Sequence, residues 1–305
     1  MKDIIIVGGG PAGLTAALYA LRNGKTVTVL EKHGPGGQIT YSPKVENWPG
    51  TMQMSGNEFA DALLDQIMAQ DGEIELEEAT GATFSGGVWT VHTADGNDFE
   101  GKSVILATGV KHRMLGLPGE NELVGEGISF CAVCDGDFYK DQVVCVAGGG
   151  NSALQEAILL AGKCSKVIML QDLPFFTGEK RLQEILFARD NVESHTGVKI
   201  TELRKDADTF KGVVIENKET GEKTAVDCDG LFVAIGLIPE NEAFASLAKL
   251  NDYGYFDSGE DCSTVTPGVF VAGDCRSKNV RQLTTAVGDG AVAALAACRY
   301  IDAMI

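Results

Sequence analysis

The sequence predicts an α/β fold in which one domain is inserted within another domain of the same plan. Two stretches, Asp3–Glu31 and Gln142–Asp172, each run from a short apolar strand through a glycine-rich turn and a helix to a second strand. Their glycine turns begin at Gly8 and Gly148, which are 140 residues apart, so each repeat is a whole domain rather than a solenoid unit. We therefore expect two Rossmann-like nucleotide-binding domains, the second inserted in the first.

Each repeat follows the same order of elements. The opening strands are apolar and rich in β-branched residues, as expected for buried parallel strands, and each helix ends near a glycine. The elements expected in the first repeat are a strand at Ile4–Val7, a helix at Leu14–Asn23 before Gly24, and a strand at Thr26–Leu30. Those expected in the second repeat are a strand at Val143–Ala147, a helix ending near Ala161, and a strand at Lys166–Leu170.

Two further apolar strands mark where the chain passes between the domains. Val104–Gly109 and Leu231–Gly236 both end in a turn. We expect the crossings near Arg113–Pro118 and Leu237–Asn241, because proline or glycine in both stretches suits a two-strand hinge. Two ordinary loops are the alternative. The predicted domains are residues 1–113 together with 241–305, and residues 114–240.

The first glycine turn has the spacing of a dinucleotide-binding site. Gly8 allows a tight turn, Gly10 lets the backbone approach a pyrophosphate, and Gly13 lets the helix pack close to the strand. The helix N-terminus offers free N–H groups and a positive dipole end to phosphates. Glu31, at the end of the next strand, is placed to accept hydrogen bonds from a ribose. The strand and helix on either side of the turn, together with the acidic residue, favour nucleotide binding over an incidental glycine turn.

The second turn keeps its glycines but lacks cationic residues for a phosphorylated ribose. It runs from Gly148 to Ala153, with alanine as an accepted variant at the third site. The 2′-phosphate of NADPH requires arginine or lysine after the next strand, but the first basic residue there is Lys180. Asp172 would repel that phosphate, although it could hold the 2′-OH of NADH. NAD(P)H binding is therefore weakly supported, and a turn that binds no nucleotide is the alternative.

Cys131 and Cys134 are separated by two residues, which is the spacing of a redox disulfide or of half a zinc site. A zinc site needs two further ligands, and none of the four histidines stands at ligand spacing, so no metal is predicted. Asp135 and Asp137 follow the pair, and a carboxylate beside a thiolate can shuttle a proton during disulfide exchange. The alternative role of these aspartates is to build an Asp-Gly turn. The pattern favours a redox dithiol over zinc ligands or buried thiols.

The overall composition excludes several classes of partner. The 305 residues carry a net charge of −18, and such a surface repels nucleic acid and anionic lipid. No apolar run approaches a membrane-spanning length, and a strand pattern at the N-terminus leaves no signal peptide. The other six cysteines lie among apolar residues, unlike a secreted disulfide framework. We therefore expect a cytoplasmic protein with no nucleic-acid or membrane partner.

Together these features resemble the low-molecular-weight thioredoxin reductases over essentially the full length of the chain. Besides the motifs named above, the matching stretches are Gly36–Gln38 with Thr40, Val45–Gly50, Ala107–Gly109, Gly273-Asp274, and Arg281-Gln282 with Thr285-Ala286. A flavin reductase of the ferredoxin–NADP type would share many of these motifs but would lack the dithiol. The resemblance implies an enzyme that reduces the disulfide of thioredoxin.

The resemblance also implies a cofactor, residue roles and an assembly. Cys134 would take electrons from FAD, Cys131 would attack the thioredoxin disulfide, and Asp135 would donate a proton. A domain rotation would present the dithiol alternately to the flavin and to thioredoxin, and the protein would form a homodimer. FAD would be bound in the first domain by Gly8, Gly10, Pro11, Ala12, Gly13, Glu31, Gly37, Gln38, Asn47, Thr108, Gly109, Asp274, Arg281, Gln282 and Leu283.

The chain departs from the family pattern at the electron donor. NADPH-dependent members carry His-Arg-Arg where this chain has Gln171–Leu173, and acidic residues where Asn151 and Gln155 stand. A smaller branch takes electrons from reduced ferredoxin, and this chain is similar to it. We therefore expect reduced ferredoxin in preference to NADPH, with an NADH- or NADPH-dependent thioredoxin reductase as the alternative. A flavin dithiol oxidase and a non-catalytic nucleotide-sensing module are the alternatives to thioredoxin reduction.

Overall fold

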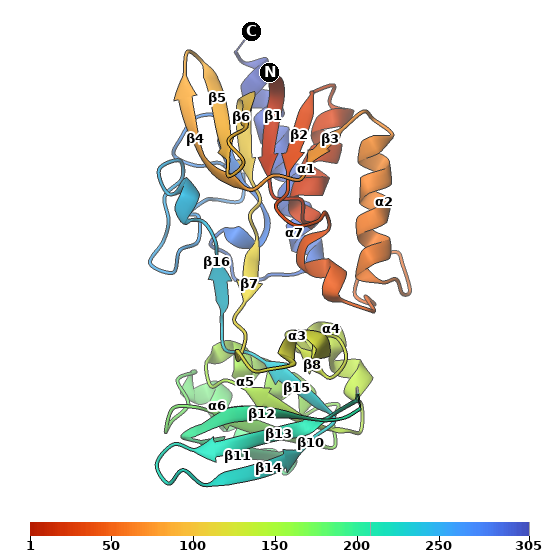
Figure 1. The fold of residues 1–305 in the computed structure, drawn as a ribbon, viewed down its shortest axis with the longest axis vertical. Coiled ribbons are helices and arrows are strands. Elements are labelled where there is room, and N and C mark those ends of the chain that lie inside the picture. Colours follow the sequence, from red (N-terminus) through yellow and green to blue (C-terminus); the bar gives the residue numbers. More distant parts are fainter. Residues whose placement is uncertain (208, 305) are drawn as a thin grey trace. The chain divides into compact units, whose positions relative to one another are not determined.

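The computed structural model describes residues 1–207 and 209–304, and the chain falls into two compact units. Unit 1 comprises Met1–Lys111 and Ile238–Ile305, and unit 2 comprises His112–Leu237. The chain thus crosses between units two residues before the first expected boundary and three residues before the second. The two crossings are strands β7 (Val110–His112) and β16 (Leu237–Pro239), which pair with each other (Figure 1).

Unit 1 is built on a seven-stranded sheet. Strand β1 (Lys2–Val7) lies between β2 (Val27–Leu30) and β6 (Asp98–Leu106), and both neighbours run parallel to it. The sheet is completed by β3 (Glu73–Glu75), β4 (Ala79–Ser85), β5 (Val88–Thr93) and β17 (Val269–Val271), of which β5 runs antiparallel to both β4 and β6. The helices are α1 (Pro11–Arg22), α2 (Gly56–Met68) and α7 (Leu283–Asp302), with 3-10 helices at Gly37–Tyr41, Glu242–Phe244 and Gly273–Cys275.

Strand β1 is apolar at successive positions because both faces of the sheet are covered. Ile4 and Ile6 belong to the core cluster that contains the inner faces of α1 and α7. Ile5 and Val7 point the other way, as the two-residue period of a strand requires, and pack with Phe244 in a second cluster. The uninterrupted β-branched run is therefore explained by burial on two sides.

Helix α1 begins where the sequence has glycine followed by proline. Gly10 is its N-cap, and Pro11 occupies the first turn, where a fixed φ suits a helix start. The helix starts three residues before the expected Leu14, because the end of the glycine turn already has helical geometry. It packs closely on α7, and a side-chain carbon on Gly290 would lie 2.2 Å from the Ala12 carbonyl oxygen. This approach requires glycine at position 290.

Unit 2 repeats the plan with a five-stranded parallel sheet in the order β11-β10-β9-β15-β8. Strand β9 (Val143–Ala147) lies in the middle, and helix α5 (Asn151–Leu160) follows the second glycine turn. The other elements are β8 (Ile128–Ser129), β10 (Lys166–Gln171), β11 (Val192–Thr196), β15 (Gly230–Val233), α3 (Glu120–Leu123), α4 (Ala132–Asp135), α6 (Lys180–Phe187) and a 3-10 helix at Gly136–Tyr139. A separate antiparallel sheet consists of β12 (Val198–Asp206), β13 (Thr209–Asn217) and β14 (Lys223–Asp227).

The predicted fold class is confirmed, because each unit has a parallel sheet, a glycine turn after its central strand and a helix after that turn. The antiparallel elements were not predicted. These are the β4–β5 hairpin of unit 1 and the three-stranded sheet of unit 2. Both add strands without changing the parallel plan on which the site depends.

Candidate active site

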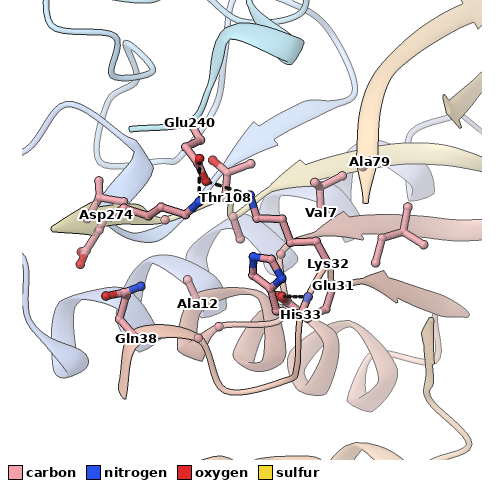
Figure 2. Close-up of a pocket in the computed structure, with 18 of the residues that line it drawn as sticks. Val7, Ala12, Glu31, Lys32, His33, Gln38, Ala79, Thr108, Glu240 and Asp274 are labelled. Atoms are coloured by element: carbon pink, nitrogen blue, oxygen red, sulfur yellow. Dashed lines mark hydrogen bonds and ion pairs between the residues drawn. The ribbon is translucent and has the colours of Figure 1, made fainter. Parts of the chain in front are cut away.

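A cavity of about 340 Å³ lies in unit 1 beyond the carboxyl ends of β1, β2 and β6 (Figure 2). This is the edge of a parallel sheet where ligands of such folds bind. The cavity is lined by residues from the stretches 7–12, 30–33, 37–38, 77–79, 107–111 and 240–244, and by Ala272, Asp274 and Ala286.

The first glycine turn is packed so tightly that it admits no side chains at two of its glycines. Gly8 has a φ of +106°, and a side-chain carbon there would lie 2.3 Å from the Ala107 carbonyl oxygen. At Gly13 the same carbon would lie 1.8 Å from the Gly8 carbonyl oxygen. Gly10, the N-cap of α1, contributes no side-chain cap. The N–H groups of the first helical turn are thus available to a phosphate.

Glu31 accepts a hydrogen bond from the first glycine turn and lines the cavity. Its Oε2 accepts a hydrogen bond of 2.7 Å from the Gly9 N–H, and its Oε1 accepts one of 2.9 Å from the His33 N–H. A carboxylate oxygen accepts more than one hydrogen bond, so both oxygens keep capacity for a ribose hydroxyl. The geometry fits the expected ribose contact.

The pairing of Glu240 with two lysines on the cavity wall was not predicted from the sequence. Glu240 lies 2.8 Å from Lys32 Nζ through one oxygen and 2.8 Å from Lys111 Nζ through the other (Figure 2). Burial alone would raise the pKa of Glu240, but the hydrogen bonds from the two lysines outweigh burial and lower it. The residues come from three distant parts of the sequence, so no local pattern indicates the network.

Asp274 is a half-buried residue in the cavity wall, and its buried oxygen Oδ1 is incompletely satisfied. Its Oδ1 lies 3.4 Å from Lys278 Nζ and accepts no hydrogen bond from the described residues. Burial raises the pKa of Asp274 above its ordinary value, against the opposing charge of Lys278. A hydroxyl-bearing ligand in the cavity would satisfy this oxygen.

The residues present fit FAD. A glycine turn and an open helix end suit its pyrophosphate, Glu31 suits its adenosine ribose, and Asp274 offers an acceptor to a hydroxylated chain. Of the expected FAD contacts, those lining the cavity are Gly8, Gly10, Pro11, Ala12, Glu31, Gly37, Gln38, Thr108, Gly109 and Asp274. Those not lining it are Gly13, Asn47, Arg281, Gln282 and Leu283.

The expected contacts outside the cavity have other partners in unit 1. Gly13 serves the packing of α1 on β1 through the close approach described above. Asn47 Nδ2 donates a hydrogen bond of 3.2 Å to Gln282 Oε1. Arg281 donates through Nε to the Asp274 carbonyl oxygen at 3.2 Å, and its guanidinium lies 4.2 Å from the centre of the Tyr255 ring. Arg281 therefore supports the segment that carries Asp274.

In unit 2, Cys131 and Cys134 are joined in a disulfide at the start of helix α4. This bond excludes the zinc-ligand alternative for the pair. Cys131 is the N-cap residue, and its Sγ accepts a hydrogen bond of 3.2 Å from the Cys134 N–H. A thiolate at this position would be stabilised by the helix end, which favours disulfide exchange.

Asp135 is linked to the disulfide through Ser129. The Ser129 hydroxyl donates to Asp135 Oδ2 at 2.5 Å and accepts from the Cys131 N–H at 3.1 Å. Burial raises the pKa of Asp135, and the Ser129 hydrogen bond only partly opposes that effect. The carboxyl group is thereby prepared to carry a proton beside the cysteines.

The second glycine turn has the backbone of the first but different chemistry at the ribose position. Gly148 has a φ of +129°, and a side-chain carbon on Gly149 would lie 2.4 Å from Gln171 Cδ. Gln171 thus occupies the place that Glu31 holds in unit 1. Asp172, which could hold the 2′-OH of NADH, lies 3.6 Å from Lys218 with 64% of its side chain exposed. Of these two neighbouring residues it is therefore Gln171 that packs on the glycine turn, because successive residues at a strand end point to opposite faces.

A cavity whose residues suit FAD, together with a redox disulfide, defines a flavin-dependent disulfide oxidoreductase. The chain belongs to the pyridine nucleotide-disulphide oxidoreductase family, whose model matches residues 2–290. The expected cofactor is confirmed, and the chain is an FAD-binding enzyme. No helix among the described residues is both long and apolar enough to cross a membrane.

Several similar proteins have a more specific name than that of the family. A thioredoxin reductase of Listeria monocytogenes is 35% identical over 303 residues, which cover 98% of this chain and 94% of that protein. One of Bacillus subtilis is 33% identical over 300 residues, covering 98% and 95%. The solved thioredoxin reductase of Streptococcus pyogenes has a TM-score of 0.94 at 37% identity and covers 99% of both chains. The resemblance to thioredoxin reductases is thereby confirmed.

Proposed function

We propose that the chain reduces the disulfide of thioredoxin. The observation that carries this proposal is the Cys131–Cys134 disulfide with Asp135 linked to it through Ser129, in a chain whose relatives are named thioredoxin reductases. Bound FAD would supply the two electrons that open the disulfide. The domains assigned to these tasks are unit 1 for FAD and unit 2 for the dithiol.

The two cysteines have different roles in the disulfide exchange. Cys134 is the thiol on the flavin side, and Cys131, at the start of α4, attacks one sulfur of thioredoxin. The substrate disulfide breaks, a mixed disulfide forms, and Asp135 gives a proton to the departing thiolate. Cys134 then attacks the mixed disulfide and releases reduced thioredoxin. The paired strands β7 and β16 serve as the hinge for the rotation that exposes the dithiol.

We propose reduced ferredoxin as the electron donor. The support is the second glycine turn, where the amide of Gln171 lies in place of an acidic or basic ribose reader. The segment that follows has no arginine or lysine before Lys180, and Lys180 and Arg181 are exposed on α6. A site of this kind offers little to hold the 2′-phosphate of NADPH.

A donor panel tests this part of the proposal. The purified flavoprotein is mixed without oxygen with NADPH, NADH or chemically reduced ferredoxin, and flavin absorbance is followed. We expect bleaching by ferredoxin at a rate well above that with either nucleotide. Rapid stoichiometric bleaching by micromolar NADPH would overturn the donor assignment and leave thioredoxin reduction standing. Peroxide production from small thiols without thioredoxin would instead identify a dithiol oxidase.

We also propose a homodimer in the cytoplasm. The cysteines outside the redox pair are all buried and free, as suits a reducing compartment, namely Cys145, Cys164, Cys228, Cys262, Cys275 and Cys298. The dimer follows from the resemblance alone. Sedimentation of the FAD-loaded protein tests it, and a single species at the monomer mass of 32.2 kDa would contradict it.

A further inference from the structure

Two buried carboxyl oxygens in unit 2 lack hydrogen-bond partners. They are Asp135 Oδ1 and Glu156 Oε2, and no other buried side-chain oxygen or nitrogen in residues 112–207 and 209–237 shares this property. Asp135 ends α4, which begins at the redox disulfide, and Glu156 lies in α5. The coincidence of the two unpaired atoms on two packed helices calls for a common explanation.

Helices α4 and α5 pack through small and apolar side chains. Ala132 of α4 and Ala157 and Leu160 of α5 belong to one core cluster. A side-chain carbon on Gly136, just after α4, would lie 3.3 Å from Leu160 Cδ2. Glu156 is the residue before Ala157, so it meets α4 at the edge of this core. An apolar residue at that position would complete the packing, so packing alone does not account for a glutamate.

No cation neutralises either carboxyl group. Among the described residues, no lysine, arginine or histidine forms an ion pair with Asp135 or Glu156, and Lys163 is taken by Asp137 at 2.8 Å. The other titratable neighbour is Tyr139, whose pKa is raised to about 12 by burial and then by Asp135, so it stays neutral. Two ionised carboxylates buried without cations would be costly, whereas one shared proton removes most of that cost.

The pKa directions agree with this geometry. Burial, and to a smaller extent the charge of Asp135, raises the pKa of Glu156 to about 8. At neutral pH the pair therefore holds a proton on Glu156. Ser129 connects Asp135 to the backbone of Cys131, so Asp135 is the member of the pair that is hydrogen-bonded toward the cysteines.

We propose that Glu156 is a positioning residue that holds one proton near Asp135 and supplies it to Asp135 during dithiol exchange. The proposal rests on the proposed function of the same cysteines. When the Cys131 thiolate breaks the substrate disulfide, Glu156 transfers its proton to Asp135, and Asp135 passes that proton to the departing thiolate. When the Cys134 thiol then attacks the mixed disulfide, its proton returns to the pair. The second thioredoxin thiolate takes its proton from water, so protons and electrons balance over the exchange.

The first test asks whether the proton exists in the wild-type protein. Infrared spectroscopy of the oxidised flavoprotein at pH 7 should show the carbonyl stretch of a protonated carboxyl group, and this band should fade as the pH rises through about 8. The band should be lost or shifted in Glu156→Gln. Glu184→Gln, which changes the net charge equally on exposed α6, should leave it unchanged. Absence of the band from wild type would overturn the proposal without bearing on thioredoxin reduction.

The second test measures one exchange without any physiological donor. Dithionite-reduced protein is mixed with oxidised thioredoxin, quenched with an alkylating reagent and analysed by mass. We expect Glu156→Gln to slow the exchange by about tenfold at pH 7 and to lose the alkaline decline seen in wild type. FAD content and thermal unfolding confirm that the variant is folded. An unchanged rate and pH profile in Glu156→Gln would overturn the role, whereas an inactive wild type would refute the proposed function itself.

Discussion

Gly8 offers a direct test of how the cofactor turn is built. Gly8→Ala would place a side-chain carbon 2.3 Å from the Ala107 carbonyl oxygen. Side-chain carbons in proteins essentially never lie closer than 3.0 Å to such an atom. It would also put alanine at a φ of +106°. Gly24→Ala is the matched control, because Gly24 also has a positive φ, +71°, but has no atom within 4 Å of the added carbon.

The expected loss of unfolding free energy has two parts, a backbone cost and a steric cost. A left-handed backbone costs a non-glycine residue ~1–2 kcal/mol, and both variants bear this cost. Overpacking against a fixed backbone adds ~1–3 kcal/mol, and only Gly8→Ala bears that cost. We therefore expect unit 1 to lose ~2–5 kcal/mol of unfolding free energy in Gly8→Ala and ~1–2 kcal/mol in Gly24→Ala.

The assay can follow unit 1 by itself. Both tryptophans, Trp48 and Trp89, lie in unit 1, so their fluorescence during urea unfolding of the apoprotein reports that unit. FAD binding is measured separately by titration, and only Gly8→Ala should weaken it, since the turn that holds the pyrophosphate must move. Equal stability losses in the two variants, together with unchanged FAD affinity in Gly8→Ala, would refute the steric explanation.

Three further outcomes follow from the site and its surroundings. Cys134→Ser should abolish thioredoxin reduction while FAD stays bound, and retained turnover would remove Cys134 from the mechanism. Glu240→Gln should cost less than ~1 kcal/mol in urea unfolding, because the ion pairs with Lys32 and Lys111 are half exposed; a larger loss would show the network to be structural. Burial lowers the pKa of His112 to about 4 from an ordinary 6.5, so its neutral form contributes stability that is complete above pH 6.5 and is lost as pH falls toward 4. Relative to His112→Leu, wild type should lose up to ~3 kcal/mol over that range in urea unfolding, and parallel pH profiles would contradict the assignment.

Local features of the fold were predictable because they depend on neighbours in sequence. The close approach of Gly13 to the Gly8 carbonyl oxygen involves one strand, one turn and one helix, so the glycine spacing alone indicates this geometry. The predicted domain boundaries differ by two and three residues from the limits of the two compact units, and both follow an apolar strand that ends in glycine. The dithiol was equally visible, since its two cysteines share one helical turn.

Features that join distant segments were not predictable in the same way. Lys32 and Glu240 are 208 positions apart, and nothing near either residue indicates the other. The sequence placed both Gln171 and Asp172 at the expected ribose position, and only the strand geometry decides which of the two faces the turn. Glu156 lies in an ordinary helical pattern, and its unpaired oxygen becomes apparent only when α4 is packed beside α5.

The pairing of β7 with β16 has a consequence for modularity. Because the inserted unit begins in one of these strands and ends in the other, its two ends lie side by side. Closing unit 1 over the gap needs only a short turn, which costs little loop entropy. We therefore expect unit 2 to be removable or replaceable without unfolding unit 1. A chain in which residues 113–236 are replaced by a hairpin turn should retain the sheet and FAD cavity of unit 1, and the same two strands could accept a foreign redox module.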